Sequence, residues 1–317
     1  QAQARRALEI AAAGGHHLLL VGPPGCGKTL LASRLPGLLP DASEAEALES
    51  AAVRSVSGRG LDPTCWRTRP FRSPHHTASA IALVGGGSEP RPGEISLAHN
   101  GVLFLDELPE WDRRALEVLR EPLESGLVTI SRAARQSEFP ARFQLVAAMN
   151  PCPCGWAGDI SARCRCSSDA ITRYRARISG PLLDRIDLHV DVPRLPPAAL
   201  RPDAPEGESS GHIRQRVIDA RQRQLDRAGV TNAALDQAAT ARDCRLAPGD
   251  QALLERAIDA LHLSARAMHR ILRVARSIAD LADAADIQTS HLAEAIGYRQ
   301  LDRAAGAERA EASAAFG

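Results

Sequence analysis

The chain of 317 residues contains a single lysine, Lys28, although lysine and arginine together number 39. Lys28 lies in a glycine-rich segment that matches G-x-x-x-x-G-K-[ST], the pattern of a phosphate-binding loop. The loop and the residue after it are Gly22, Pro23, Pro24, Gly25, Cys26, Gly27, Lys28, Thr29 and Leu30. In such a loop backbone N–H groups surround the phosphates, the lysine reaches the β- and γ-phosphates, and the Thr29 hydroxyl binds Mg²⁺. The segment therefore predicts a site for ATP and Mg²⁺.

The residues on both sides of this loop extend the motif. Residues 16–21 end in an apolar run and predict a buried strand, whereas residues 29–35 predict the start of a helix. A strand, a glycine-rich turn and a helix N-terminus form an anion site, because the helix dipole favours negative charge there. The alternative, a plain glycine-proline turn with an incidental lysine, does not account for these flanks.

Further apolar runs predict the rest of a sheet. Buried strands are expected at residues 102–105, 144–149 and 186–192. Short apolar strands that alternate with helices are typical of a parallel, doubly wound sheet, so we predict an α/β fold. Other expected elements are helices at 3–13, 41–56 (capped by Asp41 or Ser43) and 111–123, and a β-hairpin at 127–130 and 139–143. The long segment 58–93 is expected to be a functional loop.

The last third of the chain has a different pattern. Residues 194–210 are rich in proline and lack an apolar period, so they predict a linker. Helical patterns then follow at 213–227, 249–261, 264–282 and 290–303. In the third of these, apolar residues recur with the i, i+3, i+4 spacing of a helix that packs on one face. The predicted domains are therefore an ATPase domain at 1–193 and a small all-α lid domain at 211–317.

Composition limits the classes of function. Apolar content is 44% and charged content 24%, as in ordinary globular proteins, and no apolar run approaches the roughly 20 residues of a membrane span. Residues 1–6 do not resemble a signal peptide, and we expect a cytoplasmic protein without a membrane partner. Because the net charge is only +1, any binding of nucleic acid must come from local basic patches. Residues 128–185 are such a region, with nine arginines against four acidic residues, although a solvated surface would look the same.

Two acidic residues and an asparagine follow predicted strands. Asp106 and Glu107 come directly after the strand at 102–105, which is the Walker B arrangement. The Asp106 carboxylate is predicted to hold Mg²⁺, and Glu107 to act as general base for the attacking water. Asn150 directly follows the strand at 144–149, at the edge where open α/β sheets bind ligands. There its side chain can orient the attacking water. The alternative for Asn150 is a turn residue before Pro151.

Two arginines are candidates for contact with the nucleotide phosphates. Arg185 precedes the strand at 186–192 and can act as an arginine finger on a neighbouring subunit's γ-phosphate. Arg266 begins the third lid helix and can couple nucleotide state to domain closure. For both residues the alternative is an exposed arginine without a catalytic role.

Four of the seven cysteines form two C-x-C pairs, at Cys152, Cys154, Cys164 and Cys166. Clustered cysteines in a cytoplasmic protein indicate a metal site more often than disulfides, and four thiolates suit a tetrahedral structural Zn²⁺. C-x-C pairs are less usual than C-x₂-C pairs in zinc sites, so reduced cysteines or a disulfide remain alternatives. Cys65 and Cys244 are isolated, and His75, His76 and His99 lack ligand spacing, so loop packing or DNA contact is expected for these histidines.

These motifs together resemble the AAA+ ATPases. The segments between them narrow the resemblance to the magnesium chelatase-like group, whose helix-2 insert is similar to FRSPHHTAS at 71–79 and PGEISLAHNG at 92–101. Within that group, NPCPCG at 150–155 and RISGPLLDRID at 177–187 resemble the ComM/YifB branch. The resemblance covers almost the whole chain and implies an AAA+ αβα sandwich with a helical lid. Members also carry an N-terminal Lon-like domain, and we expect this sequence to be the AAA+ core without it.

The resemblance implies a hexameric ring ATPase that drives branch migration of DNA during recombination in natural transformation. It implies Lys28, Thr29, Asp106 and Glu107 in the Walker motifs. Asn150 is then sensor 1, Arg185 the finger acting on a neighbour, and Arg266 sensor 2. The hairpin is similar to the presensor-1 insert of this group, whose tips enter the ring pore. We therefore predict that Arg132 and Arg135 at its tip bind the backbone of single-stranded and branched DNA.

Two other functions fit the same motifs. One is an ATPase subunit of a complex that inserts Mg²⁺, although the cysteine pairs and the Ser-Pro-His-His segment favour the ComM branch. The other is a remodeller of protein partners. Stimulation of ATP hydrolysis by DNA distinguishes the DNA motor from both.

Overall fold

The computed structural model describes residues 1–58, 60, 62–87, 90–132, 135–159, 162–196, 199, 201, 207–261 and 263–299. The chain divides into two compact units. The first contains Gln1 and residues 19–186 and 191–207, and the second contains residues 2–18, 187–190 and 208–317. None of the helices in the described ranges combines the length and the apolar character needed to cross a membrane.

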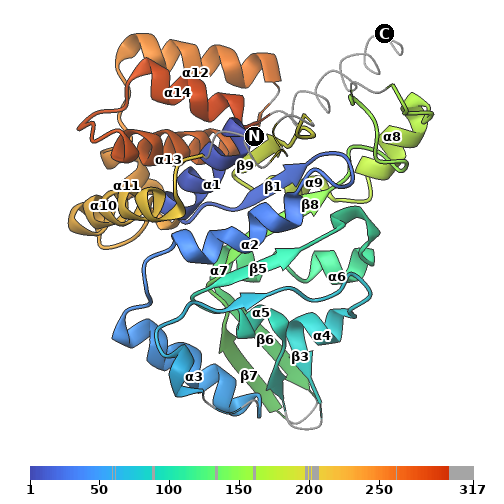
Figure 1. Ribbon diagram of the computed structural model, residues 1–317. Helices are drawn as coiled ribbons and strands as arrows, with labels where there is room; N and C mark the ends of the chain where they lie inside the picture. Colours follow the sequence, from blue (N-terminus) through green and yellow to red (C-terminus); the bar gives the residue numbers. More distant parts are fainter. Residues whose placement is uncertain are drawn as a thin grey trace. The chain divides into compact units, whose positions relative to one another are not determined.

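A five-stranded parallel sheet forms the centre of the α/β fold, with the strand order β2-β5-β8-β1-β9 (Figure 1). These strands are β1 (Leu18–Val21), β2 (Phe71–Arg72), β5 (Val102–Leu105), β8 (Gln144–Met149) and β9 (Leu188–Asp191). The interior strands β5, β8 and β1 are buried along their whole length. Their continuous apolar sequences follow from this position, because a parallel sheet covered by helices has no solvated face. The predicted strands and the parallel α/β fold are confirmed.

The sheet brings the ends of distant segments to one edge. β5 pairs with β8 from Val102↔Gln144 to Leu105↔Ala147, so Asp106 and Asn150 follow neighbouring strands. Gly22, directly after β1, donates its N–H to the carbonyl of Met149, the last residue of β8. Residues separated by more than a hundred positions in sequence therefore meet where three parallel strands end.

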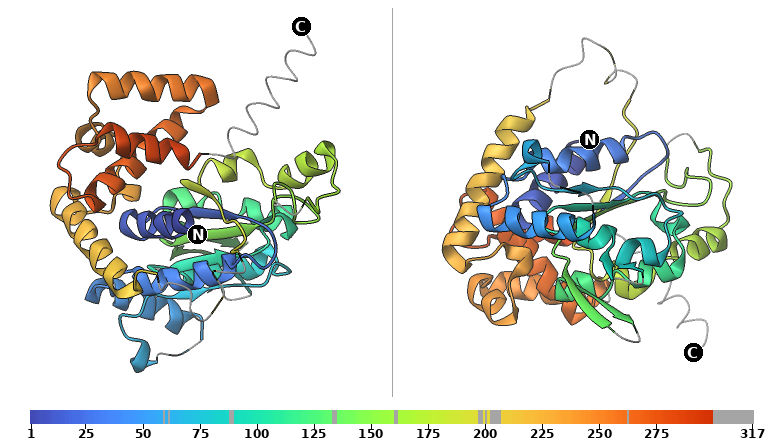
Figure 2. Two further views of the ribbon diagram at one scale, coloured as in Figure 1. Left: turned by 45° about the horizontal axis from the view of Figure 1, so that its top comes forward. Right: turned by 90° about the horizontal axis from the view of Figure 1, so that it is seen from below.

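Short elements occupy the long connections of the first unit. Segment 58–93 is not one loop, because it contains β2, α4 (Ala80–Val84) and a small pair of strands, β3 (Gly85–Gly86) and β4 (Arg91–Pro92). The hairpin is longer at its tip than expected, with β6 (Leu127–Arg132) and β7 (Arg135–Pro140). It projects away from the five-stranded sheet (Figures 1 and 2). The remaining helices are α2 (Lys28–Leu38), α3 (Glu44–Val56), α5 (Glu94–Leu97), α6 (Arg113–Glu117), α7 (Pro122–Ser125), α8 (Ser168–Arg175) and α9 (Gly180–Leu183).

The prediction of one helix at 111–123 is wrong. Two short helices, α6 and α7, replace it. Asp112 caps α6 by accepting hydrogen bonds from the backbone N–H groups of Arg114 and Ala115. Pro122 then begins α7, since proline is favoured at a first helical position and cannot continue a preceding helix. The apolar spacing was compatible with one helix, but the cap and the proline divide it.

The second unit is helical. Its helices are α1 (Ala2–Gly14), α10 (Ser210–Ala228), α11 (Gln237–Asp243), α12 (Pro248–Leu261), α13 (Ala265–Leu281) and α14 (Thr289–Gly297). α13 lies at its centre and packs against α1, α10, α11 and α14. α1 precedes the first strand in sequence, yet its buried alanine-rich surface belongs to this unit rather than to the predicted domain 1–193. The predicted helix 290–303 corresponds to α14, and residues 300–303 lie outside the described residues.

A buried polar cluster lies inside the second unit. The Asp187 carboxylate accepts hydrogen bonds from Arg270 Nη1 at 2.7 Å and from the backbone N–H of His17 at 2.9 Å. Burial opposes ionisation of Asp187, but the Arg270 guanidinium and the neighbouring His16 hold its pKa well below the ordinary value. Burial lowers the pKa of His17 to about 4, more than the Asp187 charge raises it. His17 is therefore neutral in the folded protein near neutral pH.

Candidate nucleotide-binding and hydrolysis site

The phosphate-binding loop connects β1 to α2, as predicted. Gly25 and Gly27 have φ of 74° and 91°, in the left-handed region that glycine enters without steric cost. Gly22 has a different restriction, because a Cβ there would lie 2.3 Å from the carbonyl oxygen of Val192. The glycines therefore give the loop its path, and α2 begins at Lys28 with its N-terminus directed to the loop.

Lys28 is held by the chain itself. Its side chain is buried, and Nζ donates to the carbonyl oxygens of Gly22 at 2.6 Å and Pro23 at 3.0 Å. Nζ also donates to Asn150 Oδ1 at 3.1 Å. Burial lowers the pKa of Lys28, and the nearby Cys26 and Asp106 oppose that shift. The lysine and the predicted sensor residue are thus in direct contact, although 122 positions separate them in sequence.

The two predicted Mg²⁺ ligands also lie together. Thr29 Oγ1 donates a hydrogen bond of 2.7 Å to Asp106 Oδ2. A hydroxyl and a carboxylate oxygen at this separation, beside a loop that surrounds phosphates, form the hard oxygen donor set that Mg²⁺ prefers. Leu30, the next residue, is exposed on α2. The residues present fit Mg²⁺ bound with ATP phosphates.

Glu107 has an unusual backbone and an unexpected partner. Its φ and ψ are 52° and 45°, which is rare for a residue with a side chain. Its carboxylate oxygen Oε2 lies 2.9 Å from His76 Nδ1. Asp106 Oδ1 accepts a hydrogen bond from the Glu107 N–H, and the indole of Trp111 donates to the Asp106 carbonyl. The peptide group that joins Asp106 to the predicted general base is therefore held through both its N–H and its carbonyl.

The segment after Asn150 lies against the phosphate-binding loop. Gly155 has φ of 85°, and a Cβ at this position would lie 2.7 Å from Pro24 Cδ and 3.8 Å from Asn150 Cγ. The neighbouring Cys152 is fully buried. The residues that follow the predicted sensor thus make close contact with the loop that would hold the phosphates.

The four clustered cysteines converge after β8. Cys152 Sγ lies 3.4 Å from Cys154 Sγ and 3.8 Å from Cys164 Sγ, and all four sulfur atoms lie within 4.8 Å of one another. All four are free thiols. Hydrogen bonds from the backbone N–H groups of Trp156 and Arg165 lower the pKa of Cys154 to about 6. This arrangement can hold a metal ion through four thiolates.

Arg185 is directed into its own unit. Its side chain is 7% exposed and forms an ion pair of 2.6 Å with Glu124 Oε1. Its Nε also donates to the carbonyl of Arg120, and its Nη1 to the carbonyl of Pro181. The predicted action on a neighbouring subunit would require these contacts to be exchanged.

The structure gives fewer contacts for Arg266 and for the hairpin arginines Arg132 and Arg135 than for Arg185. Arg266 is exposed in the first turn of α13, in the second unit. Arg132 and Arg135 are paired across the tip of the hairpin, and their side chains lie outside the described part of the structure. The roles assigned to these three arginines remain predictions.

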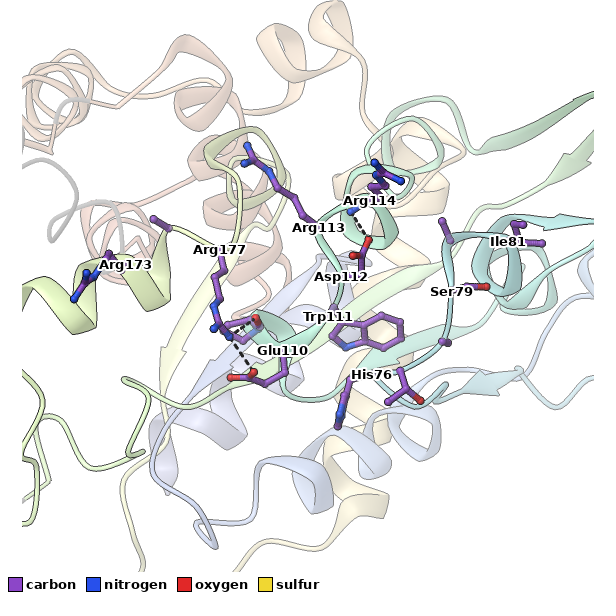
Figure 3. Close-up of a pocket in the computed structure, with 15 residues that line it drawn as sticks. His76, Ser79, Ile81, Glu110, Trp111, Asp112, Arg113, Arg114, Arg173 and Arg177 are labelled. Carbon is purple, nitrogen blue, oxygen red and sulfur yellow. Dashed lines mark hydrogen bonds and ion pairs between the residues drawn. The ribbon is translucent and has the colours of Figure 1, made fainter.

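A pocket of about 1030 Å³ lies between segment 76–81, segment 109–114 and the end of α8 (Figure 3). His76 lines it, with the exposed residues Arg113, Arg114, Arg173 and Arg177. Arg177 is paired with Glu110 at 2.9 Å, and the Asp112 carboxylate is used as the cap of α6. The lining therefore has an excess of positive charge, next to the partner of the predicted base.

Sequence reasoning missed two residues of this site. His76 was assigned to loop packing or DNA contact, and Gly155 received no role. The His-His pair in FRSPHHTAS was visible, but Glu107, the partner of His76, lies 31 positions away, after β5. His99 is a packing residue, because it binds Glu49 and accepts a hydrogen bond from the Arg142 N–H.

A parallel sheet with a phosphate-binding loop, an adjacent Thr29–Asp106 pair and a helical region define a P-loop ATPase of the AAA+ class. The family described as magnesium chelatase, subunit ChlI, matches residues 1–200, and its C-terminal part matches residues 207–299. The chain belongs to this magnesium chelatase-like family and is of the ComM/YifB type.

Individual relatives agree with this assignment. The competence protein ComM of Haemophilus influenzae is 54% identical over 96% of this chain, and the uncharacterized protein YifB of Escherichia coli is also 54% identical over 96%. The chain covers 59% and 60% of their lengths, respectively. The chloroplastic magnesium-chelatase subunit ChlI of Chlamydomonas reinhardtii is 28% identical over 44% of this chain and 32% of its own length.

Proposed function

We propose that this chain is the ATPase core of a hexameric DNA motor that drives branch migration during recombination in natural transformation. The observation that carries the ATPase part is the convergence of Lys28, Thr29, Asp106 and Asn150 at the ends of three strands. The name of the competence protein ComM supports the cellular role. A cytoplasmic location agrees with four clustered thiols, which stay reduced there.

In this proposal each residue exchanges a contact within the chain for a contact with nucleotide. The Lys28 ammonium leaves the carbonyl oxygens of the loop and binds the β- and γ-phosphates. Thr29 and Asp106 hold Mg²⁺, which neutralises charge on the phosphate oxygens when bound. Glu107 accepts the proton of the attacking water, and Asn150 orients that water. Arg266 binds the phosphates from the lid.

Arg185 is proposed to complete the site of a neighbouring subunit. An arginine finger stabilises charge that develops on the transferred phosphoryl group. Its ion pair with Glu124 would then hold the side chain in subunits without a neighbour. Arg185→Ala is expected to abolish hydrolysis and leave binding of an ATP analogue unchanged. Loss of folding instead, measured by thermal unfolding, would assign Arg185 a structural role.

We propose that DNA binds at the hairpin tip through Arg132 and Arg135. The hairpin projects from the sheet, and two arginines at its turn can contact phosphates without base specificity (Figure 1). The test is ATP hydrolysis at low salt with and without single-stranded and branched DNA. DNA is expected to stimulate hydrolysis by the unchanged chain.

The hairpin contribution is tested by replacing both arginines with alanine. Arg132→Ala/Arg135→Ala is expected to weaken DNA binding and lower its salt dependence, because fewer counterions are released. Arg34→Ala/Arg245→Ala removes the same charge at two exposed positions outside the hairpin and is the matched control. Equal affinity and equal salt slopes in the two double variants would exclude the hairpin.

A magnesium chelatase subunit is the second candidate, and the family match favours it. Hydrolysis that DNA does not change would support this function or a protein remodeller. The cysteine cluster and the much higher identity to ComM favour the DNA motor.

We further propose that the four cysteines hold a structural Zn²⁺. A tetrahedral ZnS₄ centre with Zn–S bonds of about 2.3 Å places its sulfur atoms about 3.8 Å apart. The sulfur separations of 3.4, 3.7 and 3.8 Å agree with that value and are far longer than a disulfide bond. Elemental analysis of protein purified without chelator is expected to give one equivalent of zinc. Less than about a tenth of an equivalent would contradict it.

A further inference from the structure

We propose that the arginine-lined pocket between segment 76–81, segment 109–114 and the end of α8 binds single-stranded DNA (Figure 3). The inference rests on the proposed DNA motor and gives it a second contact besides the hairpin tip. The pocket has a volume of about 1030 Å³, at the top of the range for sites that take organic molecules. It therefore has room for individual nucleotides of an unpaired strand.

Three arginines of the pocket wall form no ion pair within the part of the chain that the structure describes. Arg113 and Arg114 begin α6, and Arg173 lies in the last turn of α8. All three are exposed. Like charges on one concave surface raise the local concentration of anions, so this pocket attracts a polyanion.

The acidic residues of the wall neutralise only part of this charge. Glu110 pairs with a fourth arginine, Arg177, at 2.9 Å, and Asp112 accepts hydrogen bonds from the N–H groups at the start of α6. Guanidinium groups bind phosphate oxygens through parallel N–H bonds. The three arginines of α6 and α8 therefore favour phosphate groups as the ligand.

The pocket wall also contains small and apolar side chains. They belong to Ala78, Ala80, Ile81, Pro109 and Ala176. Ile81 is 63% exposed. A free phosphate ion would gain nothing from these carbon atoms, whereas the sugars and base faces of DNA would bury them. The lining therefore indicates nucleotides rather than inorganic phosphate.

The same lining distinguishes a single strand from a duplex. In a duplex the base faces are stacked on one another, so only an unpaired strand can place them on apolar side chains. The hydroxyl groups of the wall are engaged within the chain, since Ser79 Oγ caps α4 and Thr77 Oγ1 lies 2.9 Å from His75 Nδ1. Binding through phosphates and base faces is expected to depend little on sequence.

The pocket and the hairpin belong to the same unit of the chain. α5 packs against α4, which borders the pocket, and also against β6 of the hairpin. A strand held at both places would bind more tightly than at either, because the second contact is then intramolecular.

The test measures binding of a labelled oligothymidylate by fluorescence anisotropy over a range of salt concentrations. Arg113→Ala/Arg173→Ala is expected to raise Kd by about tenfold or more and to lower the salt slope by about 0.7 for each lost phosphate contact. Arg34→Ala/Arg245→Ala removes the same charge at exposed positions outside the pocket and should bind like the unchanged chain.

Ile81→Ser separates the apolar contact from the charge. It is expected to raise Kd for the oligothymidylate by about threefold or more and to leave the salt slope unchanged, because it removes apolar surface and no charge. Binding of a labelled duplex should change by less than about twofold, since its base faces are not available. A loss as large for the duplex would contradict a single-strand site.

Equal Kd values and salt slopes in the pocket and control double variants, in protein that unfolds at the same temperature, would overturn the inference. So would an unchanged chain that binds no single-stranded DNA. A loss of assembly in sedimentation velocity, with unchanged DNA affinity, would assign the pocket to a contact between copies of the chain instead.

ATP hydrolysis separates the inference from the proposed motor. If the pocket variants bind DNA weakly but DNA does not stimulate hydrolysis by the unchanged chain, the motor fails and the pocket site stands. If DNA stimulates hydrolysis and the pocket variants bind DNA like the control, the motor stands and the pocket site fails.

Discussion

The side chains of the ATP site form a set of contacts that nucleotide can replace. Lys28 is bound to three oxygen atoms of the chain, and Thr29 is bound to Asp106. Each bond keeps a buried or charged group paired, which avoids the cost of an unsatisfied polar group. Glu107 follows the same rule through His76. Nucleotide binding is therefore an exchange of partners at these residues.

His17 makes stability depend on pH at the residue scale. Its pKa falls from the ordinary 6.5 to about 4 in the folded protein, so the unfolded chain binds the proton first. Stability is therefore complete above pH 6.5 and decreases as pH falls toward 4, by about 1.4 kcal/mol per unit. Asp187, whose pKa is depressed below its ordinary value, loses its contribution only at still lower pH. Urea unfolding from pH 7 to 4.5 should show a shallower decrease for His17→Gln than for the unchanged chain.

The control for this measurement is the exposed His212 on α10. His212→Gln should keep the pH dependence of the unchanged chain. An equal slope in the His17 and His212 variants would contradict a neutral His17 in the folded protein.

At the scale of elements, the segment after β8 connects three features. Asn150 contacts Lys28, Gly155 touches Pro24, and Cys152 joins the sulfur cluster. A metal bound by the cysteines would therefore brace the segment that lies on the phosphate-binding loop. This coupling depends on contacts between a loop and a strand end, which no local sequence pattern describes.

Two glycines of this segment test the coupling. Gly155 and Gly158 both have positive φ, of 85° and 76°, so alanine strains the backbone at either position. A Cβ at Gly155 would meet Pro24 at 2.7 Å, whereas one at Gly158 would meet nothing within 4 Å. Gly155→Ala is expected to weaken binding of a fluorescent ATP analogue by about tenfold or more relative to Gly158→Ala, as a shifted loop loses more than about 1.4 kcal/mol. Equal affinities would show that this contact does not position the loop.

Elements differ in how well their sequences predicted them. The buried strands were predicted because interior strands of a parallel sheet must be apolar throughout. Asp41 and Ser43 were the two caps expected for α3, and the structure shows that Ser43 is the cap and forms a capping box with Glu46. The prediction of one helix at 111–123 was wrong. Its apolar spacing fits a single helix, but Asp112 caps α6 and Pro122 begins α7, so the segment forms two short helices. The short elements β2, α4, β3 and β4 have too few residues to show a period, and pairing with other segments stabilises them.

At the scale of the whole molecule, the chain forms two compact units and spans about 60% of the length of the curated relatives it matches. Assembly into a ring would bring an arginine of one subunit to the ATP of the next. Such assembly usually depends on nucleotide, because the phosphates form part of the interface.

The expected result in sedimentation velocity is a nucleotide-dependent change of mass. Glu107→Gln with ATP and Mg²⁺ should sediment as six copies of the 33.8 kDa chain, since the bound nucleotide is not hydrolysed. Lys28→Ala should remain smaller under the same conditions, because it lacks the phosphate contact. A monomer in all conditions would argue against a ring formed by this chain alone.

The sequence by itself determined the phosphate-binding loop, the buried strands, the Walker B pair and the cysteine pairs. These features are local, since glycine spacing, apolar runs and adjacent acidic residues act within a few positions of each other. Only the tertiary structure decided the partners: Lys28 with Asn150, Glu107 with His76, Gly155 with Pro24 and Arg185 with Glu124. It also placed α1 with the C-terminal helices. The reason is physical, because these contacts depend on the register of parallel strands and on packing between segments far apart in the chain. A local sequence pattern contains information on neither.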